Sequence, residues 1–415
     1  MILIPPAPDP RADLAAFVAQ TLSPGAPVFV GASGGGDSTA LTLLLAPIAR
    51  GQGRRLVAGI VDHALREGSD RDAAHAAAIV GALGAETRIV RLDWPQGPRS
   101  AQTHARSARY SALATLAREV GAGTLFLGHT RDDQAETLRM RLDAGSGPRG
   151  LAGMAPLSPC PIWPAGRDLL LARPLLQWRR ETLRQLLRTE SVDWLEDPAN
   201  ALARFARVRA RAQLVETGET EALAAMADAH ARTAGAVDRE AREFLDASVV
   251  VAEDRVTIAG VTEDAACARA LAVVAAAVGG AGREPAPEAV ARLAARLATG
   301  QDGTLAGARF RAGRVIHVSR DRGGVLGRRG GGAAIGELPL PEGLTVVWDG
   351  RLALTAREAG LAAIAPDAAD TALRPLIRRG GAVATLAATP EVAARWLVAD
   401  RIDRLLWRAP RGSGA

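Results

Sequence analysis

Short apolar runs alternate with longer segments of helical spacing from Val28 to about Ala144. The short runs predict strands, and apolar positions three and four apart predict helices. The predicted strands are Val28–Gly31, Leu56–Val61, Thr87–Val90 and Thr124–Leu127, and the predicted helices are about Ser38–Ala49, Asp70–Leu83, Ala101–Val120 and Asp132–Asp143. This alternation indicates an α/β fold with a doubly wound parallel sheet, covered by helices on both faces. Such sheets bind ligands beyond the carboxyl ends of their strands, so we expect the chemistry in the loops after Val30, Val61 and Leu127.

The pattern changes beyond this region. Gly145–Arg173 is rich in glycine and proline and predicts a long loop rather than further elements, followed by a helix over about Arg179–Thr189. Residues 217–300 are rich in alanine, carry 8 arginines against 13 acidic residues, and predict a mostly helical region. Residues 301–330 carry 7 arginines against 2 acidic residues. We predict domains over residues 1–215, 216–335 and 336–415, the last a small appendage with β-structure around Trp348.

Composition narrows the chemistry. The chain has 415 residues, 48% of them hydrophobic, which is enough for two or three domain-sized cores. Its formal net charge is +6, and it contains no lysine, so all 51 basic residues are arginine. The absence of lysine excludes a Walker A phosphate loop and Schiff-base chemistry, because both need an amine. The arginine content itself fits either a basic surface or the codon usage of a GC-rich genome.

Cysteine content and the N-terminus indicate the compartment. The two cysteines, Cys160 and Cys267, are far apart and form neither a disulfide framework nor a metal knuckle, which favours a reducing cytoplasm. The N-terminus lacks a basic segment followed by a long apolar stretch, and no run of about 18 apolar residues occurs. We therefore expect a cytoplasmic protein without a membrane partner.

A glycine turn between a predicted strand and a predicted helix is the strongest chemical signal. Its residues are Ser33, Gly34, Gly35, Gly36, Asp37 and Ser38. Successive glycines let backbone N–H groups curl toward an anion, and the helix N-terminus adds the positive end of its dipole. Asp37 would repel a bare phosphate, so its presence favours a bridging Mg²⁺ or a role in orienting the loop. The alternative is an ordinary turn in a chain with 44 glycines.

Two further clusters fall at predicted strand ends. Asp62 and His63 end the second strand, where they are either nucleotide contacts or ordinary polar caps. His129 follows the fourth strand, and Asp133 and Glu136 are three residues apart, so both carboxylates lie on one helical face. Acidic residues in a first helical turn commonly complement the helix dipole. Two carboxylates aimed at one pocket can also hold a cationic amine or a metal ion.

The string from Ser33 to Ser38 resembles the pyrophosphate-binding loop of the PP-loop ATP pyrophosphatase superfamily. Together with the strand-end clusters, five further stretches resemble the bacterial tRNA(Ile)-lysidine synthetase family over about residues 26–215. These stretches are Ala105–Tyr110, Gly145–Met154, Arg173–Leu176, Trp194–Asn200 and the arginine string Arg204–Arg211.

The resemblance implies a PP-loop fold and a defined reaction. ATP adenylates C2 of the wobble cytidine in the CAU anticodon of tRNA(Ile), and free L-lysine then attacks to give lysidine, AMP and pyrophosphate, so that the codon read changes from AUG to AUA. The implied ATP contacts are Ser33, Gly34, Gly35, Gly36, Asp37, Ser38, Asp62, His63 and His129, with Mg²⁺ at Asp37. Members of the family often form dimers, although no interface is readable in this sequence.

The implied chemistry assigns roles to four further side chains. A guanidinium, from Arg106 or Arg109, stabilises charge at the α-phosphate. Asp133 and Glu136 bind the lysine, and one of them accepts its proton. The sequence leaves both choices open.

Departures from the family pattern, and rival functions, can be judged from particular residues. His129-Thr130 stands where the family often has His-His, and Arg207-Val208-Arg209-Ala210-Arg211 stands for the usual Arg-Asn-x-Ile-Arg. A tRNA thiolase would need paired cysteines near the pocket, and an amidotransferase would need a glutaminase domain for which the chain before Val28 has no room. A nucleotide-binding protein without catalysis would have no evident use for two carboxylates facing the pocket.

Two sets of arginines are candidates for tRNA binding. Arg207 and Arg211 are four apart and would share a helix face that can meet phosphates. The second set is the basic stretch Arg309, Arg311, Arg314, Arg320, Arg322, Arg328 and Arg329, which follows an acidic segment. For both sets the alternative is a solvated basic surface.

Overall fold

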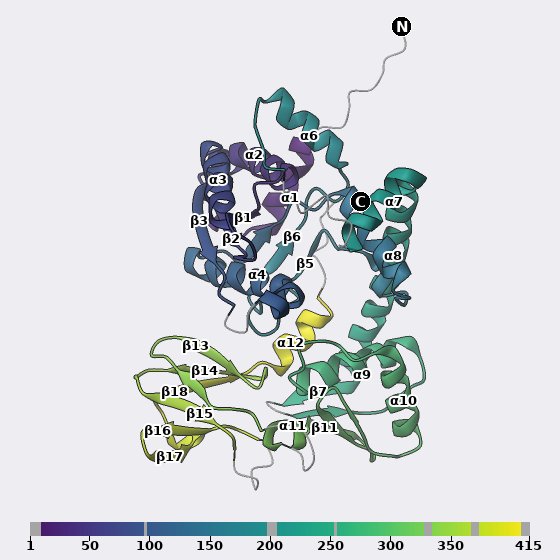
Figure 1. The fold of residues 1–415 in the computed structure, drawn as a ribbon. Helices are drawn as coiled ribbons and strands as arrows, with labels where there is room; N and C mark the ends of the chain where they lie inside the picture. The colour runs from purple at the N-terminus through teal and green to yellow at the C-terminus, as the bar shows by residue number, and fades with distance from the viewer. Residues whose placement is uncertain are drawn as a thin grey trace. The chain divides into compact units, whose positions relative to one another are not determined.

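Six strands form one sheet in the order β3-β2-β1-β4-β6-β5 (Figure 1). All neighbours are parallel except β5 with β6. The strands are β1 (Val28–Ala32), β2 (Leu56–Asp62), β3 (Glu86–Arg91), β4 (Thr124–Phe126), β5 (Leu157–Pro159) and β6 (Leu170–Ala172). This computed structural model describes residues 10–94, 98–196, 206–252, 255–327, 334–366 and 373–407. The α/β fold and the four strands predicted before residue 130 are confirmed.

Helices connect the strands and cover the sheet. They are α1 (Pro10–Thr21), α2 (Gly36–Gly51), α3 (Ser69–Ala82), α4 (Pro98–Val120), α5 (Arg131–Asp143), α6 (Arg180–Thr189) and α7 (Ala206–Thr217). The chain moves outward from β1 to β3 through α2 and α3, then returns through α4 to β4 beside β1. Because crossovers are right-handed, this reversal places α4 on the opposite face from α2 and α3. Phe29, Val57 and Leu125 pack with Leu113 of α4 in the core of that face.

The reversal at β1 and β4 creates the crevice in which doubly wound sheets bind ligands. The loops that follow these two strands lie side by side there. A Cβ atom added at Gly128 would lie 2.6 Å from the carbonyl oxygen of Asp37, in the first turn of α2. Only glycine permits this approach, so the sequence brings the two loops together.

The prediction of a loop over Gly145–Arg173 is wrong in part. This segment contains the 3-10 turn η1 (Gly150–Ala152) and the strands β5 and β6. Each strand has three residues, too few to display a period, and Pro159 ends β5. The hydrogen bonds of β4 to β6 and of β6 to β5 supply the order that the local sequence does not indicate.

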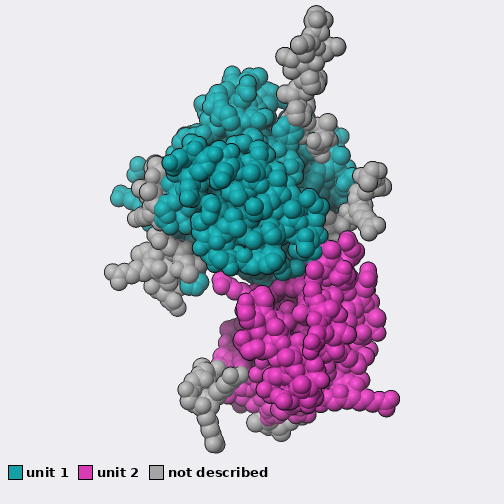
Figure 2. Space-filling view, turned by 90° about the vertical axis from the view of Figure 1, so that its right-hand side faces the viewer, with its two compact units in different colours: residues 1–234, 408–415 teal, residues 235–407 magenta. Residues whose placement is uncertain are grey.

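A second compact unit comprises residues 235–407, and the first comprises residues 1–234 with 408–415 (Figure 2). Helix α8 (Thr220–Ser248) runs from one into the other. The second unit contains α9 (Ala265–Val278) and α10 (Pro287–Ala298), which confirm the helical prediction. The unit boundary differs from the predicted boundaries at 215 and 335, and the three-domain division stays a prediction.

The second unit also contains a five-stranded sheet that was not predicted. Its strands are β7 (Val249–Ala252), β8 (Arg255–Ile258), β9 (Gly303–Leu305), β10 (Ala308–Arg311) and β11 (Ile316–Arg320), in the order β7-β8-β11-β10-β9 and followed by α11 (Gly323–Leu326). Phe310 and Val318 of this sheet pack against Leu271 and Val274 of α9. The alternation of buried and exposed residues in β10 places Arg309 and Arg311 on the outer face.

Residues from 338 onward form two small sheets, in agreement with the predicted β-structure. Their strands are β12 (Leu338–Leu340), β13 (Thr345–Trp348), β14 (Leu352–Ala356), β15 (Leu361–Ile364), β16 (Leu376–Arg379), β17 (Ala382–Thr385) and β18 (Val392–Trp396), and α12 (Val398–Leu405) follows. Asp349 and Gly350 both have positive φ, as a tight hairpin turn between β13 and β14 requires.

Among the described helices none has the length and apolar character to cross a membrane.

Candidate active site

The turn between β1 and α2 is held in shape by its own hydroxyl groups. The Ser33 backbone N–H donates to the Ser38 hydroxyl oxygen at 3.1 Å, and that hydroxyl donates to the Gly35 carbonyl at 3.0 Å. Thr39 donates its hydroxyl to the Gly34 carbonyl at 3.2 Å. Gly34 has a φ of +77°, which side chains other than glycine rarely adopt. These hydrogen bonds and the φ of Gly34 fix the shape of the loop.

A distant segment completes this loop. The Leu195 N–H donates to the Gly34 carbonyl at 2.8 Å, and Trp194 packs beside Gly36. Trp194 and Glu196 are joined by a hydrogen bond of 2.8 Å from the indole nitrogen. Residues 194–196 belong to one of the stretches that carry the family resemblance, and the remainder of that stretch, 197–200, lies outside the described residues.

Asp37 stands in the first turn of α2 and faces the crevice. Its Oδ2 accepts a hydrogen bond from Arg180 Nε at 3.0 Å, and its Oδ1 is buried without a partner among the described groups. Burial raises the pKa of Asp37 to about 6, against the opposing effect of Arg180. A buried carboxylate oxygen without a partner is a position that a cation can fill.

Helix α5 begins with a capping box that fixes Asp133. The Asp133 N–H donates to the Thr130 hydroxyl, while Asp133 Oδ2 accepts from the Thr130 N–H at 2.8 Å. The second oxygen, Oδ1, takes no part in the cap and faces the crevice. Glu136 follows one turn later with its side chain 1% exposed. The predicted common face of Asp133 and Glu136 is therefore present, and one guanidinium, that of Arg180, contacts both of them and Asp37.

Three guanidinium groups meet these three carboxylates. We call the six residues the ion-pair cluster: Asp37, Asp133, Glu136, Arg180, Arg207 and Arg211. Arg207 lies 2.9 Å from Glu136 Oε2 and 3.3 Å from Asp133 Oδ1, and Arg211 lies 2.7 Å from Glu136 Oε1. The i,i+4 spacing correctly placed the two arginines of α7 on one face. The groups that they contact in this structure are carboxylates.

Arg180 was not predicted from the sequence. It contacts Asp37, Asp133 and Glu136 at 3.0, 3.0 and 3.2 Å. It lies at the start of the helix predicted over about Arg179–Thr189, in which no site residue was predicted. The available signal was the pair Arg179-Arg180 a few residues after the Arg173–Leu176 stretch, but nothing local shows which of the two points inward.

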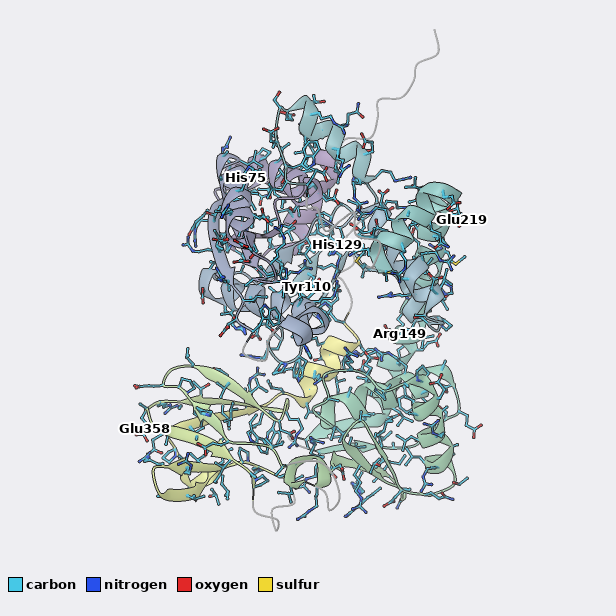
Figure 3. All side chains as sticks on the ribbon, in the orientation of Figure 1. His75, Tyr110, His129, Arg149, Glu219 and Glu358 are labelled. Carbon is cyan, nitrogen blue, oxygen red and sulfur yellow. The ribbon has the colours of Figure 1, made fainter. Side chains whose placement is uncertain are left out.

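His129, after β4, interacts electrostatically with Arg106 and Arg109 of α4, and His63, after β2, interacts with Arg109. Figure 3 labels His129 and Tyr110 of α4. Burial lowers the pKa of His129 well below its usual value, and burial together with Arg109 lowers the pKa of His63. Both imidazoles are therefore neutral at pH 7, and each has a buried Nδ1 without a partner among the described groups. Arg106 and Arg109 lie 5.2 and 5.3 Å from the Tyr110 ring centre.

Asp62 occupies a different environment. Its Oδ1 accepts the Ala64 N–H at 2.8 Å, where Ala64 has a φ of +49°. Burial by itself would raise the pKa of Asp62. The hydrogen bonds from Ser69 and Ala64 outweigh this effect, and the pKa is lowered. The carboxylate is engaged in holding the turn after β2, which is the structural alternative raised for it above. Its role as a nucleotide contact stays a prediction.

A family model described as a PP-loop domain matches residues 9–217. A tRNA(Ile)-lysidine synthase of Caulobacter vibrioides is 38% identical over 346 residues, which cover 82% of this chain and 76% of that protein. This chain belongs to the tRNA(Ile)-lysidine synthase family. A member from Rhizobium meliloti is 34% identical over 80% of this chain and 73% of its own, and one from Hyphomonas neptunium is 45% identical over 45% of this chain and 50% of its own.

A solved structure of the U34-tRNA thiolase NcsA from Methanococcus maripaludis aligns with a TM-score of 0.41 at 18% identity, covering 53% of this chain and 76% of that chain. Both cysteines of this chain are buried in hydrophobic cores. Cys160 packs in the core that includes residues of α4, and Cys267 lies on α9. Neither belongs to the ion-pair cluster.

The tRNA-binding prediction for Arg320 does not fit its surroundings. Its side chain is 10% exposed, and it donates to both oxygens of Asp349 at 3.0 and 2.9 Å and to the Gly307 carbonyl at 2.8 Å. A guanidinium held this way joins β11 to the hairpin turn after β13 and is not available to a phosphate. Arg322 is exposed, and Arg328 and Arg329 lie outside the described residues.

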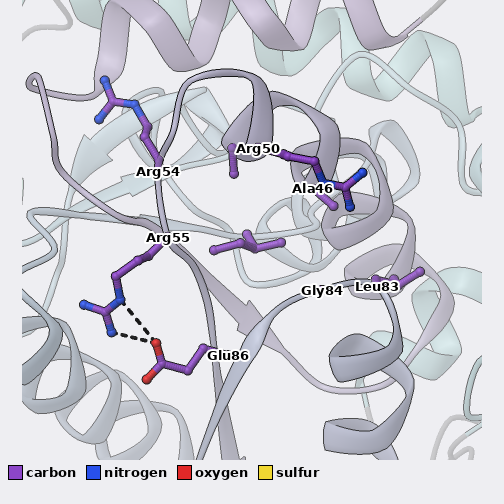
Figure 4. A pocket seen from close by; sticks show the side chains of 9 residues that line it. Ala46, Arg50, Arg54, Arg55, Leu83, Gly84 and Glu86 are labelled. Carbon is purple, nitrogen blue, oxygen red and sulfur yellow. Dashed lines mark hydrogen bonds and ion pairs between the residues drawn. The ribbon is translucent and has the colours of Figure 1, made fainter.

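A surface hollow of about 310 Å³ lies at the amino ends of β2 and β3, which is the end of the strands opposite to the glycine turn (Figure 4). Arg55 donates to Glu86 at 2.7 Å, and Arg54 donates to the carbonyls of Ser23 and Ala26, both at 2.7 Å. These guanidinium groups are satisfied by the protein itself. Because parallel sheets bind ligands at the other end of their strands, we place the candidate site at the ion-pair cluster.

Proposed function

We propose that this chain ligates L-lysine to C2 of the wobble cytidine in the CAU anticodon of tRNA(Ile), through an adenylated tRNA, with release of AMP and pyrophosphate. The product reads AUA in place of AUG. The proposal is carried by the carboxylates Asp133 and Glu136, which face the phosphate-loop helix of a synthase-family chain. The reaction needs a phosphate-binding loop and an amine-binding site next to each other. The glycine turn suits an anion, and the two carboxylates suit a cation.

The turn Ser33–Ser38 is proposed to bind the phosphates of ATP. Its backbone N–H groups and the N-terminus of α2 attract an anion. Asp37 would hold Mg²⁺ through Oδ1, whose buried and unpartnered state fits a cation ligand. When bound, Mg²⁺ neutralises charge on the phosphates. The neutral His63 and His129 can offer hydrogen bonds to the nucleotide without adding charge.

A guanidinium beside the α-phosphate is proposed to stabilise the charge that develops there when the cytosine carbonyl oxygen attacks. Arg106 and Arg109 both stack near Tyr110, which is fully buried and restricts their positions. Arg109 is the less exposed of the two, and it lies close enough to His63 to lower that residue's pKa. We therefore favour Arg109 as the residue at the α-phosphate, with Arg106 nearer the entrance.

The lysine ammonium is proposed to replace a guanidinium of α7 at the carboxylates. Arg207 and Arg211 are 38% and 34% exposed, whereas Glu136 is 1% exposed, so the arginines can leave toward solvent and the carboxylate cannot. Once the amine is seated, a carboxylate accepts one of its protons, and the neutral amine attacks C2. Asp133 Oδ1 is the proposed acceptor, because Oδ2 remains bound to the helix cap and keeps the side chain in place.

The tRNA body is proposed to bind the outer face of the sheet in the second unit. Arg309, Arg311, Arg314 and Arg322 are exposed, and Arg309 and Arg311 alternate with core residues along β10. Exposed guanidinium groups on one strand can contact successive phosphates. A homodimer and a cytoplasmic location remain expectations of the sequence.

Incorporation of radiolabelled lysine tests the proposal. The purified chain is incubated with ATP, Mg²⁺, labelled lysine and a tRNA(Ile) transcript with a CAU anticodon. We expect acid-precipitable label with stoichiometric pyrophosphate release, and no label in a matched transcript with a GAU anticodon. Binding of ATP and tRNA without pyrophosphate or label would instead identify a binding protein that lacks catalysis.

A further inference from the structure

We propose that Arg180 is a positioning residue that holds the phosphate-loop helix and the amine-binding carboxylates in one fixed geometry, so that a single side chain supports both half-reactions. This inference rests on the proposed function. It assigns a role to a side chain of α6 that lies outside the phosphate loop and outside the carboxylate pair.

The contacts of Arg180 divide among three carboxylates. Nε lies 3.0 Å from Asp37 Oδ2, Nη2 lies 3.0 Å from Asp133 Oδ1, and Nη1 lies 3.2 Å from Glu136 Oε1. The first carboxylate comes from α2 and the other two from α5. A guanidinium presents its donors in a rigid planar fork, so each nitrogen fixes one carboxylate relative to the others. A lysine at this position would supply a single charge without that geometry.

The start of α6 is itself fixed. The Arg180 N–H donates to Asp132 Oδ2 at 2.8 Å, and Arg179 pairs with the same carboxylate at 3.1 Å. The Arg131 N–H donates to the Trp178 carbonyl at 2.9 Å. The apolar side of α6 is buried through Leu183 and Leu187, and the helix packs against α2. The backbone that bears the Arg180 side chain therefore contacts α5 and packs against α2, the two helices that the guanidinium joins.

Arg207 and Arg211 differ from Arg180 in their exposure and in the helices whose carboxylates they contact. Their side chains are 38% and 34% exposed against 15% for Arg180, and the carboxylates that they pair with among the described residues all belong to α5. Among the described side chains, Arg180 alone forms an ion pair with Asp37. If a substrate ammonium takes the place of an α7 arginine, Arg180 remains as the cation between Asp37 and Asp133, which would otherwise repel each other across the crevice.

Kinetics of Arg180 variants test the inference. We expect Arg180→Ala to lower kcat for pyrophosphate release and for lysine incorporation by about 100-fold each, because small misplacements of reacting groups carry losses of that order. The KM for ATP should change by less than about threefold, since the loop backbone binds the phosphates. Arg180→Lys should recover about tenfold of the loss. Arg139→Ala, on α5 in a pair with the exposed Asp143, is the matched control.

Chemical rescue separates positioning from folding. Millimolar guanidinium ion should restore activity to Arg180→Ala, whereas methylammonium should restore less, and neither should affect Arg139→Ala. Wild-type kcat in Arg180→Lys would overturn the inference, because a point charge would then suffice. So would activity of Arg180→Ala within threefold of the wild type in both steps. Failure of the wild-type chain to form lysidine is a different result, and it contradicts the proposed function instead.

A stability measurement tests the same geometry without any turnover. Asp37 and Glu136 lie on different helices and share Arg180, so the shifts in urea midpoint caused by Asp37→Asn and Glu136→Gln should not add in the wild-type background. In an Arg180→Gln background the two shifts should add. Additivity in both backgrounds would overturn the inference even if the enzyme's substrates proved to be different.

Discussion

Asp37 ionises at a cost in the folded chain, because burial opposes its charge more strongly than Arg180 favours it. Its pKa rises from 3.8 to about 6 on folding, so the folded chain binds more protons than the unfolded chain between these values. The free energy of unfolding contributed by this group therefore falls as the pH rises through that window and is constant above it.

Asp37→Asn should remove this pH dependence. The interval from 3.8 to about 6, at roughly 1.4 kcal/mol per pH unit, corresponds to about 3 kcal/mol. We expect the variant to gain stability relative to the wild type by up to that amount between pH 4 and pH 6. Urea unfolding across this range measures the difference in unfolding free energy between the two proteins. The other carboxylates are present in both proteins, so their contributions are subtracted. A difference that stays constant with pH would show that Asp37 ionises normally.

Asp133→Asn and Glu136→Gln test the amine site. A hydrogen bond to a charged group contributes about 1.5–3 kcal/mol, so we expect a ten- to hundredfold rise in the lysine concentration required, while adenylated tRNA still accumulates. Lysine titrations with pyrophosphate release as a parallel readout measure both effects. Asp143→Asn, on the same helix in an exposed pair with Arg139, serves as the control. An unchanged lysine requirement in both variants would exclude these carboxylates as the amine site.

Sequence reasoning found residues whose role follows from local spacing. Asp37 follows the glycine turn, and Asp133 and Glu136 share a face because three residues make nearly one helical turn. Arg180 could not be found this way, because its partners lie 143, 47 and 44 positions away in the chain. Arg320 shows the converse case: a stretch rich in arginine predicts a tRNA contact there, whereas Asp349, in the turn after β13, accepts two hydrogen bonds from its guanidinium.

Elements were predictable where one period persisted over enough residues. The strands β1 to β3 and the helices α2 to α6 emerged from apolar spacing, and the three-residue strand β4 from the apolar run Thr124–Leu127 that follows a predicted helix. The three-residue strands β5, β6 and β9 carry no detectable period, and the arginines that alternate along β10 suggested a basic segment instead of an amphipathic strand. In each case, pairing with a neighbouring strand decides a structure that the local sequence leaves undecided.

At the level of elements, the close approach of β4 to α2 should be sensitive to a single methyl group. A Cβ at residue 128 would lie 2.6 Å from the Asp37 carbonyl oxygen, so Gly128→Ala must push the two loops apart. We expect a loss of roughly 1–3 kcal/mol in unfolding free energy, together with weaker ATP binding. Gly123→Ala, before the same strand with nothing within 4 Å, is the matched control. Equal stability of the two variants would contradict the close approach.

For the whole molecule, tRNA affinity should depend on exposed arginines of the second unit. Each arginine that no longer neutralises a phosphate should flatten the slope of log affinity against log salt by about 0.7–0.9. We expect replacement of Arg309, Arg311, Arg314 and Arg322 by serine to weaken tRNA binding and flatten this slope, with ATP binding unchanged. Arg395→Ser, in an exposed pair with Asp400, is the control. Wild-type affinity and slope in the fourfold variant would direct attention to α7 as the element that binds the phosphates.

The hydrogen bond from Leu195 to Gly34 has a consequence for the order in which the protein assembles. The glycine turn is made early in translation, yet the strand-like partner that completes it is encoded some 160 positions later. A nascent chain that ends before Trp194 lacks both residues of this segment that contact the glycine turn. Truncations that end at residue 190 should therefore bind ATP more weakly than truncations that end at residue 234, although both retain every residue of the glycine turn.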